Sequence, residues 1–320
     1  MLKLFLAVLL ALAVAAPASA AMPLHVIFDT DMGNDVDDAL ALAMLHAFAS
    51  RGELKLLAVT LSKDNPWAAE YVRMVDEYYG RATIPVGIVH DGKTKEDGLY
   101  VRQVCELHGR HPNQAAVSDA VELLRKTLAG ENDGEVTLIQ VGFSTNLARL
   151  MESKPDRYSN LSGMELIRKK VRLLTVMAGN FATNQPEYNV KTDVPAAGKL
   201  FAAWPTDMYI SGFEVGLVVL YPASSIEHDF PAGNPVAEAY RAYAKMPYDR
   251  PSWDLTTVLY DLRPDRGYFD ISPPGDVTVA LNGATTFQPG AQGKRYFLKV
   301  SPLQASRVTD SLVWLASQPK

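Results

Sequence analysis

Residues 26–45 read VIFDTDMGNDVDDALALAML. The apolar residues that end at Phe28 predict a first strand over residues 24–28, and the apolar residues after Asp38 predict a helix over residues 38–48. Between them lies the acidic loop, residues 29–38, which holds five aspartates. A strand, a polar loop and a helix in this order are typical of an α/β fold in which sites form beyond the carboxyl ends of strands.

The rest of the chain continues the alternation of strand and helix. Short β-branched runs are separated by amphipathic segments, which predicts a mostly parallel, Rossmann-like open sheet with helices on both faces. A small antiparallel addition is expected late in the chain, followed by a final helix over residues 303–315. The predicted strands are 54–61, 84–89, 136–141 and 171–177, the late pair is 276–283 and 294–300, and the earlier helices are 68–79 and 116–128.

Composition narrows the class of protein. The chain has 320 residues, 48% of them hydrophobic and 21% charged, with a formal net charge of −5, which is ordinary for a globular protein. No basic run is present, so nucleic acid is not an expected partner. No linker-like break divides residues 21–320, which are expected to form a single domain. The sole cysteine, Cys105, lies in a predicted amphipathic helix and is expected to be a buried apolar residue.

Residues 1–20 have the pattern of a signal peptide. Lys3 precedes an apolar run, and the segment closes with Ala18-Ser19-Ala20, a small-residue cleavage site. The run is too short for a retained membrane span, so no stable membrane anchor is expected. The sequence therefore predicts an exported protein, periplasmic or secreted, that is cleaved near Ala20.

The acidic loop indicates a bound cation. Ordinary aspartate pKa values of about 3.9 leave all five carboxylates ionised at neutral pH, and a helix N-terminus stabilises one or two of them by only about 0.3–1 kcal/mol each. Oxygen-only ligands suit Ca²⁺ or Mg²⁺. Helix capping explains one aspartate. An EF-hand does not fit, because Asn34 and Leu40 stand where Gly and Glu are needed. Gly33 stands where phosphatases with an aspartate nucleophile usually have Thr or Val.

Several stretches resemble the inosine–uridine-preferring nucleoside hydrolases, which are calcium-dependent N-ribohydrolases. The resemblance covers about residues 24–262 and is specific through the combination of its motifs. The matching stretches are the acidic loop, LAVTLSKDN ending at Asn65, VTLIQVGFSTNLARL from Val136, LLTVMAGNF and PEYNVKTDVPAA around Glu187, and PSWDLTTVLYDL around Asp254.

The resemblance implies a role for each matching residue. Asp31 would be a calcium ligand and the general base for the attacking water, and Asp38 would be a bidentate ligand. The backbone carbonyl of Val141 and the carboxylate of Asp254 would complete the protein ligands. The residues that would hold the ribose hydroxyls are Asp37, Asn65, Asn184, Glu187 and Asn189.

This sequence departs from the family pattern in two main places. The acidic loop is two residues longer than the common form, so Asp35 could replace Asp37 in one role. Trp253 stands where purine-specific members have a histidine that protonates the leaving base, and an indole N–H cannot do so. Trp253 could instead form a wall for the base. Asn180 is a rival for Asn184, and His90, at the end of a predicted strand, is a second candidate for contact with the leaving group.

Several of these residues also have a purely structural interpretation. Asn65 in a DNP turn is a good helix N-cap, and so is Asp254. Glu187 and Asn189 would face the same way if the segment is extended. The expected function is hydrolysis of a ribonucleoside; the alternatives are hydrolysis of another ribosyl conjugate or glycoside, or nucleoside binding without catalysis. The strands after residue 267 could serve a homo-oligomer contact or simply close the sheet.

Overall fold

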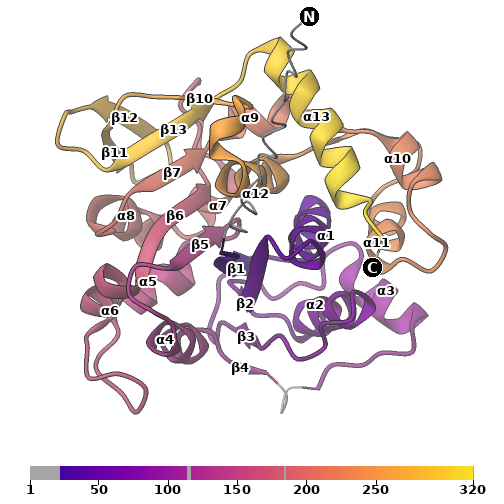
Figure 1. Cartoon of the computed structure of the whole chain (residues 1–320), viewed down its shortest axis with the longest axis horizontal. Coiled ribbons are helices and arrows are strands. Elements are labelled where there is room, and N and C mark those ends of the chain that lie inside the picture. The colour runs from indigo at the N-terminus through magenta and orange to yellow at the C-terminus, as the bar shows by residue number, and fades with distance from the viewer. Residues whose placement is uncertain (1–21, 114–116, 184, 320) are drawn as a thin grey trace, which may run out of the picture.

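The computed structural model describes residues 22–113, 117–183 and 185–319. The predicted signal peptide and Asn184 lie outside these ranges. A mostly parallel sheet runs through the molecule, with helices packed on both of its faces (Figure 1). The strand order is β12-β11-β13-β7-β6-β5-β1-β2-β3-β4, with β10 beside β13. The predicted fold class is confirmed.

The central strands carry the apolar runs of the sequence. β1 lies between β2 and β5 and is parallel to both, with Asp29 opposite Thr60 on one side and Gln140 on the other. The strands of this sheet are β1 (Leu24–Thr30), β2 (Leu54–Leu61), β3 (Val86–Ile88), β4 (Ser118–Asp119), β5 (Val136–Gln140), β6 (Val171–Met177), β7 (Met208–Ser211), β10 (Asp270–Ile271), β11 (Gly275–Val279), β12 (Thr285–Pro289) and β13 (Arg295–Lys299).

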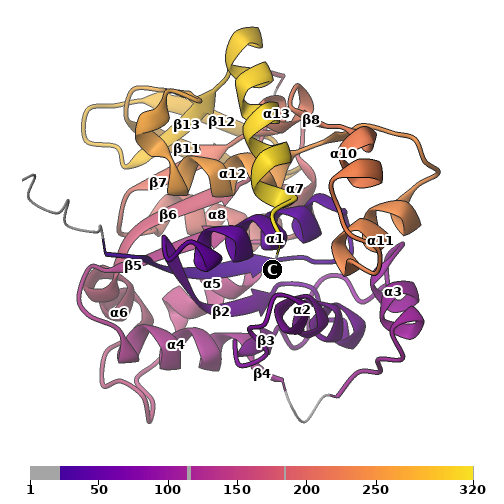
Figure 2. The same cartoon turned by 45° about the vertical axis from the view of Figure 1, so that its right-hand side comes forward.

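Helices cover both faces of the sheet and bury two separate apolar cores. Figures 1 and 2 show α1, α2, α12 and α13 on one face and α4, α5, α6 and α8 on the other. The helices are α1 (Asp37–Ser50), α2 (Pro66–Tyr78), α3 (Val101–Leu107), α4 (Ala120–Gly130), α5 (Thr145–Glu152), α6 (Gly163–Lys170), α7 (Tyr188–Thr192), α8 (Val194–Ala203), α9 (Phe213–Leu217), α10 (Ala223–His228), α11 (Pro235–Tyr243), α12 (Trp253–Leu262) and α13 (Pro302–Ala316), with a 3₁₀ turn at Pro264–Arg266.

The predicted boundaries differ from the structure where turn chemistry acts. Helix α2 begins two residues before the predicted start, because Pro66 fits the first helical position and Asn65 caps it. Helix α4 begins at Ala120, after Asp119 caps it, and the predicted start at residue 116 lies outside the described ranges. Cys105 is buried in α3 as expected. None of the helices in the described ranges is long and apolar enough to cross a membrane.

The late antiparallel addition is present and is joined to the main sheet. The two predicted late strands correspond to β11 and β13, which pair antiparallel only at Gly275 and Arg295. The main antiparallel partner of β11 is β12, a strand that was not predicted. β13 pairs antiparallel with β11 and parallel with β7, so the addition extends the main sheet instead of forming a separate one. A short separate pair, β8 (Leu220–Tyr221) and β9 (Arg250–Pro251), lies near the amino end of α12.

Candidate active site

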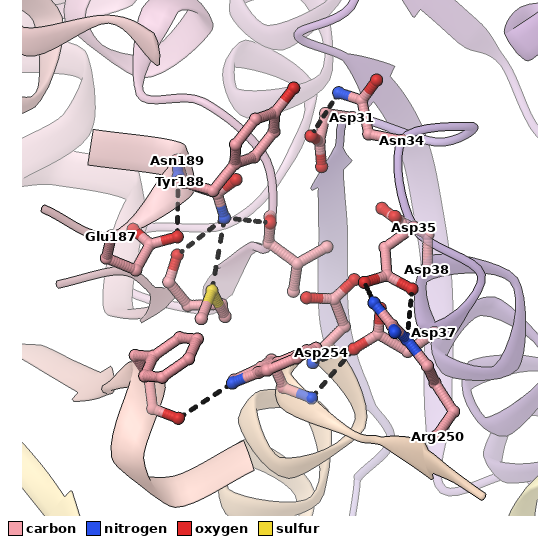
Figure 3. Close-up of a pocket in the computed structure, with 14 residues that line it drawn as sticks. Asp31, Asn34, Asp35, Asp37, Asp38, Glu187, Tyr188, Asn189, Arg250 and Asp254 are labelled. Carbon is pink, nitrogen blue, oxygen red and sulfur yellow. Dashed lines mark hydrogen bonds and ion pairs between the residues drawn. The ribbon is translucent and has the colours of Figure 1, made fainter. Parts of the chain in front are cut away.

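A cavity of about 400 Å³ opens at the carboxyl ends of β1, β5 and β6. The sequence order of the strands reverses at β1, and such a point is where α/β sheets bind ligands. Figure 3 shows the side chains that converge on it. The lining residues are Asp31, Asn34, Asp35, Asp37, Asp38, Val141, Met177, Glu187, Tyr188, Asn189, Phe213, Arg250, Trp253 and Asp254.

The first aspartate of the acidic loop does not line this cavity. Asp29 is buried, and its Oδ1 accepts hydrogen bonds from Thr60 Oγ1 at 2.6 Å and Asn146 Nδ2 at 2.7 Å. Burial raises the pKa of Asp29 to about 7 despite these bonds. Asp29 therefore joins β1 to its neighbours, and the other four aspartates of the loop face the cavity.

Three carboxylates form the tightest group. Asp37, Asp38 and Asp254 are buried, and one oxygen from each lies within 4.8 Å of the others. The pKa of each is raised well above its ordinary value, first by burial and then by the charges of neighbouring aspartates. Thr30 Oγ1 donates a hydrogen bond to Asp38. No lysine or arginine of the described residues forms an ion pair with these three carboxylates.

Helix starts hold this group together. Asp37 and Asp38 are the first residues of α1, and Asp254 is the second residue of α12. Asp37 Oδ2 accepts hydrogen bonds from the backbone N–H groups of Trp253 at 2.8 Å and Asp254 at 3.0 Å. Asp37 therefore caps the neighbouring helix while it stands among the carboxylates.

Asp31 lies at the edge of the same cavity, outside the group of three. Its Oδ2 accepts a hydrogen bond of 2.7 Å from Asn34 Nδ2, and the Lys63 ammonium donates to Asn34 Oδ1. Burial raises the pKa of Asp31 to about 6, opposed by the Asn34 bond and the Lys63 charge. Gly142 makes room for this backbone, because a Cβ on Gly142 would lie 2.5 Å from the Asp31 nitrogen.

Asp35 and Asp37 occupy different places. Asp35 forms a two-pronged ion pair with Arg250, with Nε donating to Oδ1 at 2.9 Å and Nη2 donating to Oδ2. Asp37 stands with Asp38 and Asp254. The longer loop left open whether Asp35 or Asp37 stands with the other carboxylates. In the structure Asp37 does, and Asp35 instead pairs with the guanidinium of Arg250.

The opposite wall comes from β5, β6 and α7. Asn189 Nδ2 donates to the carbonyl of Val141 at 2.8 Å. Glu187 caps α7, and its Oε1 accepts from Asn189 N at 2.7 Å. Burial raises the pKa of Glu187 to about 7. The segment is a helix start, not an extended strand, yet Glu187 and Asn189 both line the cavity.

Other sequence candidates lie elsewhere. Asn65 caps α2 and donates to Lys95 O and Asp97 Oδ1, both at 2.9 Å, so it has the structural role that its turn motif allowed. Asn180 accepts bonds from the two backbone N–H groups that follow in its own turn. His90 lines a separate cavity. None of these three side chains is among the residues that line the main cavity.

Trp253 lines the cavity with its ring already fixed. Its Nε1 donates to the carbonyl of Phe213 at 2.8 Å, and the two rings stack with centroids 5.5 Å apart. Gly216 leaves the space, because a Cβ there would lie 2.2 Å from Trp253 Cδ1. The indole N–H is therefore committed to the protein backbone.

Sequence reasoning missed several lining residues: Asn34, Met177, Tyr188, Phe213 and Arg250. Asn34 was visible inside the acidic loop, and Arg250 directly precedes the PSWDLTTVLYDL motif. Position next to a motif was the available signal for both. Phe213 had none, because it follows β7, a strand that was not predicted.

The residues present fit a divalent cation. Buried carboxylates that repel one another and have no basic partner require a positive charge from elsewhere. The donors are all oxygens, from Asp37, Asp38, Asp254 and Asp31, with the Val141 carbonyl in the same lining. Such a set suits Ca²⁺ or Mg²⁺.

Comparisons with known proteins place the chain in a family. Residues 26–301 match the family model of the inosine-uridine preferring nucleoside hydrolases. A pyrimidine-specific ribonucleoside hydrolase RihA from Enterobacter sp. (strain 638) is 29% identical over 273 residues, which covers 76% of this chain and 80% of that protein. RihA of Salmonella agona (strain SL483) is 30% identical over 231 residues, 68% of each chain.

Solved structures share the fold. A plant nucleoside hydrolase, PpNRh1, superposes with a TM-score of 0.71 at 21% identity and covers 93% of this chain and 100% of its own. The inosine-uridine preferring nucleoside hydrolase from Bacillus anthracis has a TM-score of 0.70 at 20% identity, with 92% and 99% covered.

Proposed function

Because the chain belongs to the inosine-uridine preferring nucleoside hydrolase family, and is thus a hydrolase that acts on ribonucleosides, we propose that it is an exported, calcium-dependent N-ribohydrolase of pyrimidine nucleosides. The observation that supports calcium is the buried group of Asp37, Asp38 and Asp254, which has no basic partner among the described residues. The pyrimidine preference is supported by the relatives named RihA.

The residues of the cavity divide into two tasks. Asp31, held by Asn34, accepts a proton from the attacking water. Asp37, Glu187 and Asn189 converge on the space where the ribose hydroxyls bind, as the polar groups of a small-molecule site do. Bond cleavage builds positive charge on the sugar, and the surrounding carboxylates stabilise that charge.

Calcium would be held by Asp31, Asp38, Asp254 and the Val141 carbonyl, with Asp37 beside them. When bound, such a cation lowers the pKa of a coordinated water and offsets the repulsion between the carboxylates. Calcium takes six to eight oxygens. These residues leave room in that shell for water and for a cis-diol, which favours ribonucleosides over deoxyribonucleosides.

Export is supported by the leader pattern of residues 1–20, which lie outside the described ranges. The prediction is that the mature chain begins near Ala21. N-terminal sequencing of the protein recovered from the periplasm and the medium tests it. A full-length chain that stays in the cytoplasm would contradict export.

A panel of ribonucleosides tests the reaction. Release of reducing sugar from uridine, cytidine, inosine and adenosine is measured with calcium and with EGTA. We expect calcium-dependent release that is fastest with the pyrimidine nucleosides. Fastest release from inosine would contradict the pyrimidine preference, and full activity in EGTA would contradict calcium. No release from any nucleoside would favour another ribosyl conjugate or a binding protein.

A further inference from the structure

The cleaved base needs a partner on its side of the cavity, and most nearby donors are already engaged. Trp253 Nε1 donates to the backbone of Phe213. The amide of Asn34 donates to Asp31, and that of Asn189 donates to the Val141 carbonyl. In Figure 3, Tyr188 lies on the Asp31 side of the cavity, away from Arg250.

Arg250 is the only lysine or arginine in the lining of the cavity among the described residues. Two of its nitrogens bind Asp35, one on each carboxylate oxygen. Its guanidinium carbon lies 4.9 Å from the centroid of the Tyr243 ring and 5.4 Å from that of Trp253. An ion pair and two ring contacts fix the guanidinium, whose Nη1 has no hydrogen-bond partner among the described residues.

Resting on the function proposed above, we propose that Arg250 is a catalytic residue that binds the departing pyrimidine and stabilises it as an anion. A pyrimidine that leaves without a proton carries negative charge on N1 and on the adjacent O2 oxygen. A guanidinium presents planar, charged donors that suit such a group, and its charge persists at any working pH.

The electron balance of the step is simple. The bond between C1′ and N1 breaks, and its electron pair goes to the base. The oxygen of the attacking water forms a bond to C1′, and its proton goes to the Asp31 carboxylate. The base anion, held by Arg250, takes a proton from solvent after release, and Asp31 returns its proton to solvent, so the products are ribose and neutral base.

Two substrates separate this role from a structural one. Uridine has a poor leaving group that needs charge stabilisation, whereas the nitrophenolate of 4-nitrophenyl β-D-ribofuranoside leaves without help. Arg250→Met is expected to lower kcat for uridine by about 10²–10³-fold and to change kcat for the nitrophenyl riboside less than about threefold. Equal losses on both substrates, or no loss on uridine, would overturn the role.

Arg263→Met is the matched control. Arg263 also pairs with a carboxylate, Glu53, and lies over an aromatic ring, with its guanidinium carbon 4.6 Å from the Phe48 centroid. Its side chain is 26% exposed, against 25% for Arg250, but it is not in the cavity lining. This variant should keep both activities.

A second variant guards against misfolding. Arg250→Lys keeps the charge and loses the planar fork, so it should retain nitrophenyl riboside turnover and lower uridine kcat about tenfold. If Arg250→Lys turned uridine over as fast as wild type, the planar guanidinium would not be needed and this part of the proposal would be overturned. A wild-type protein that cleaves neither substrate, or that cleaves the nitrophenyl riboside but no nucleoside, would refute the proposed function itself. Uridine cleavage by the wild type that Arg250→Met leaves unchanged would refute only the leaving-group role.

Discussion

Asn34 orients Asp31: its side-chain amide donates a 2.7 Å hydrogen bond to Asp31 Oδ2, while its carbonyl accepts from the Lys63 ammonium. Lys63 is buried, and its burial lowers its pKa. The three side chains form a chain from the segment after β2 to the acidic loop. One carboxylate oxygen of Asp31 is therefore already hydrogen-bonded to Asn34. The positive charge of Lys63 lies on the other side of Asn34.

Asn34→Ala should lower kcat/KM for uridine about tenfold. A hydrogen bond to a charged group contributes about 1.5–3 kcal/mol, and about 1.4 kcal/mol corresponds to a factor of ten in rate. Steady-state kinetics measure the loss. Asn132→Ala is the control, because Asn132 also donates to a carboxylate, Glu135, but is exposed and far from the cavity lining. Unchanged kinetics in Asn34→Ala would contradict the orienting role.

Asp31→Asn should abolish turnover and keep nucleoside binding. A positioned general base contributes about 10²–10⁴-fold, and the amide cannot accept the proton. Uridine hydrolysis and uridine binding by calorimetry are measured on the same samples. Wild-type turnover in this variant would remove Asp31 from the role of base.

Calcium should raise the melting temperature of the protein. The repulsion between Asp37, Asp38 and Asp254 destabilises the metal-free fold, and a ligand at 100 times its Kd adds about 2.7 kcal/mol. Differential scanning fluorimetry with calcium and with EGTA measures the shift. Asp254→Asn should lose most of it, whereas Asp133→Asn, at an exposed acidic position, should keep it. Identical melting in calcium and EGTA would count against the cation site.

Asp261→Asn should stabilise the protein at high pH. Asp261 is buried in α12, and neither of its carboxylate oxygens has a hydrogen-bond partner in the described residues. Burial raises the pKa of Asp261 to about 7 from the ordinary aspartate value of 3.8.

The folded protein holds this proton to about pH 7, and the unfolded chain loses it near 3.8. The wild-type free energy of unfolding therefore falls as pH rises between these values. The variant should be the more stable protein at pH 8, and its advantage should shrink toward pH 4. Urea unfolding at both pH values measures this, and an advantage that does not change with pH would refute the shifted pKa.

Much of the architecture could be predicted because burial leaves a clear pattern. The central strands β1, β2, β5 and β6 are apolar runs, and their expected ranges agree with the structure to within two residues. β7 was missed because it has only four residues, and β12 was missed because its sequence, TTFQP, holds no apolar run. Pairing with neighbouring strands, which no local pattern records, makes them strands.

The site was predictable where residues cluster in sequence. The acidic loop and the segment around Glu187 stand out locally, and both line the cavity. Arg250 could not be assigned to the site from sequence, because it is held there by an ion pair with Asp35, which lies 215 residues earlier in the chain. Asn65 has the same residue type as a ribose ligand, yet its side chain is occupied by the α2 cap.

Calcium binding and uridine hydrolysis, measured on the same samples of wild type and Asp38→Asn, test the cation-dependent reaction most directly. Protein stripped of metal is titrated with calcium by calorimetry and assayed for ribose at each point. We predict one calcium ion per chain and activity that rises with occupancy, and the loss of both in Asp38→Asn. Full ribose release by the stripped wild-type protein would contradict the account.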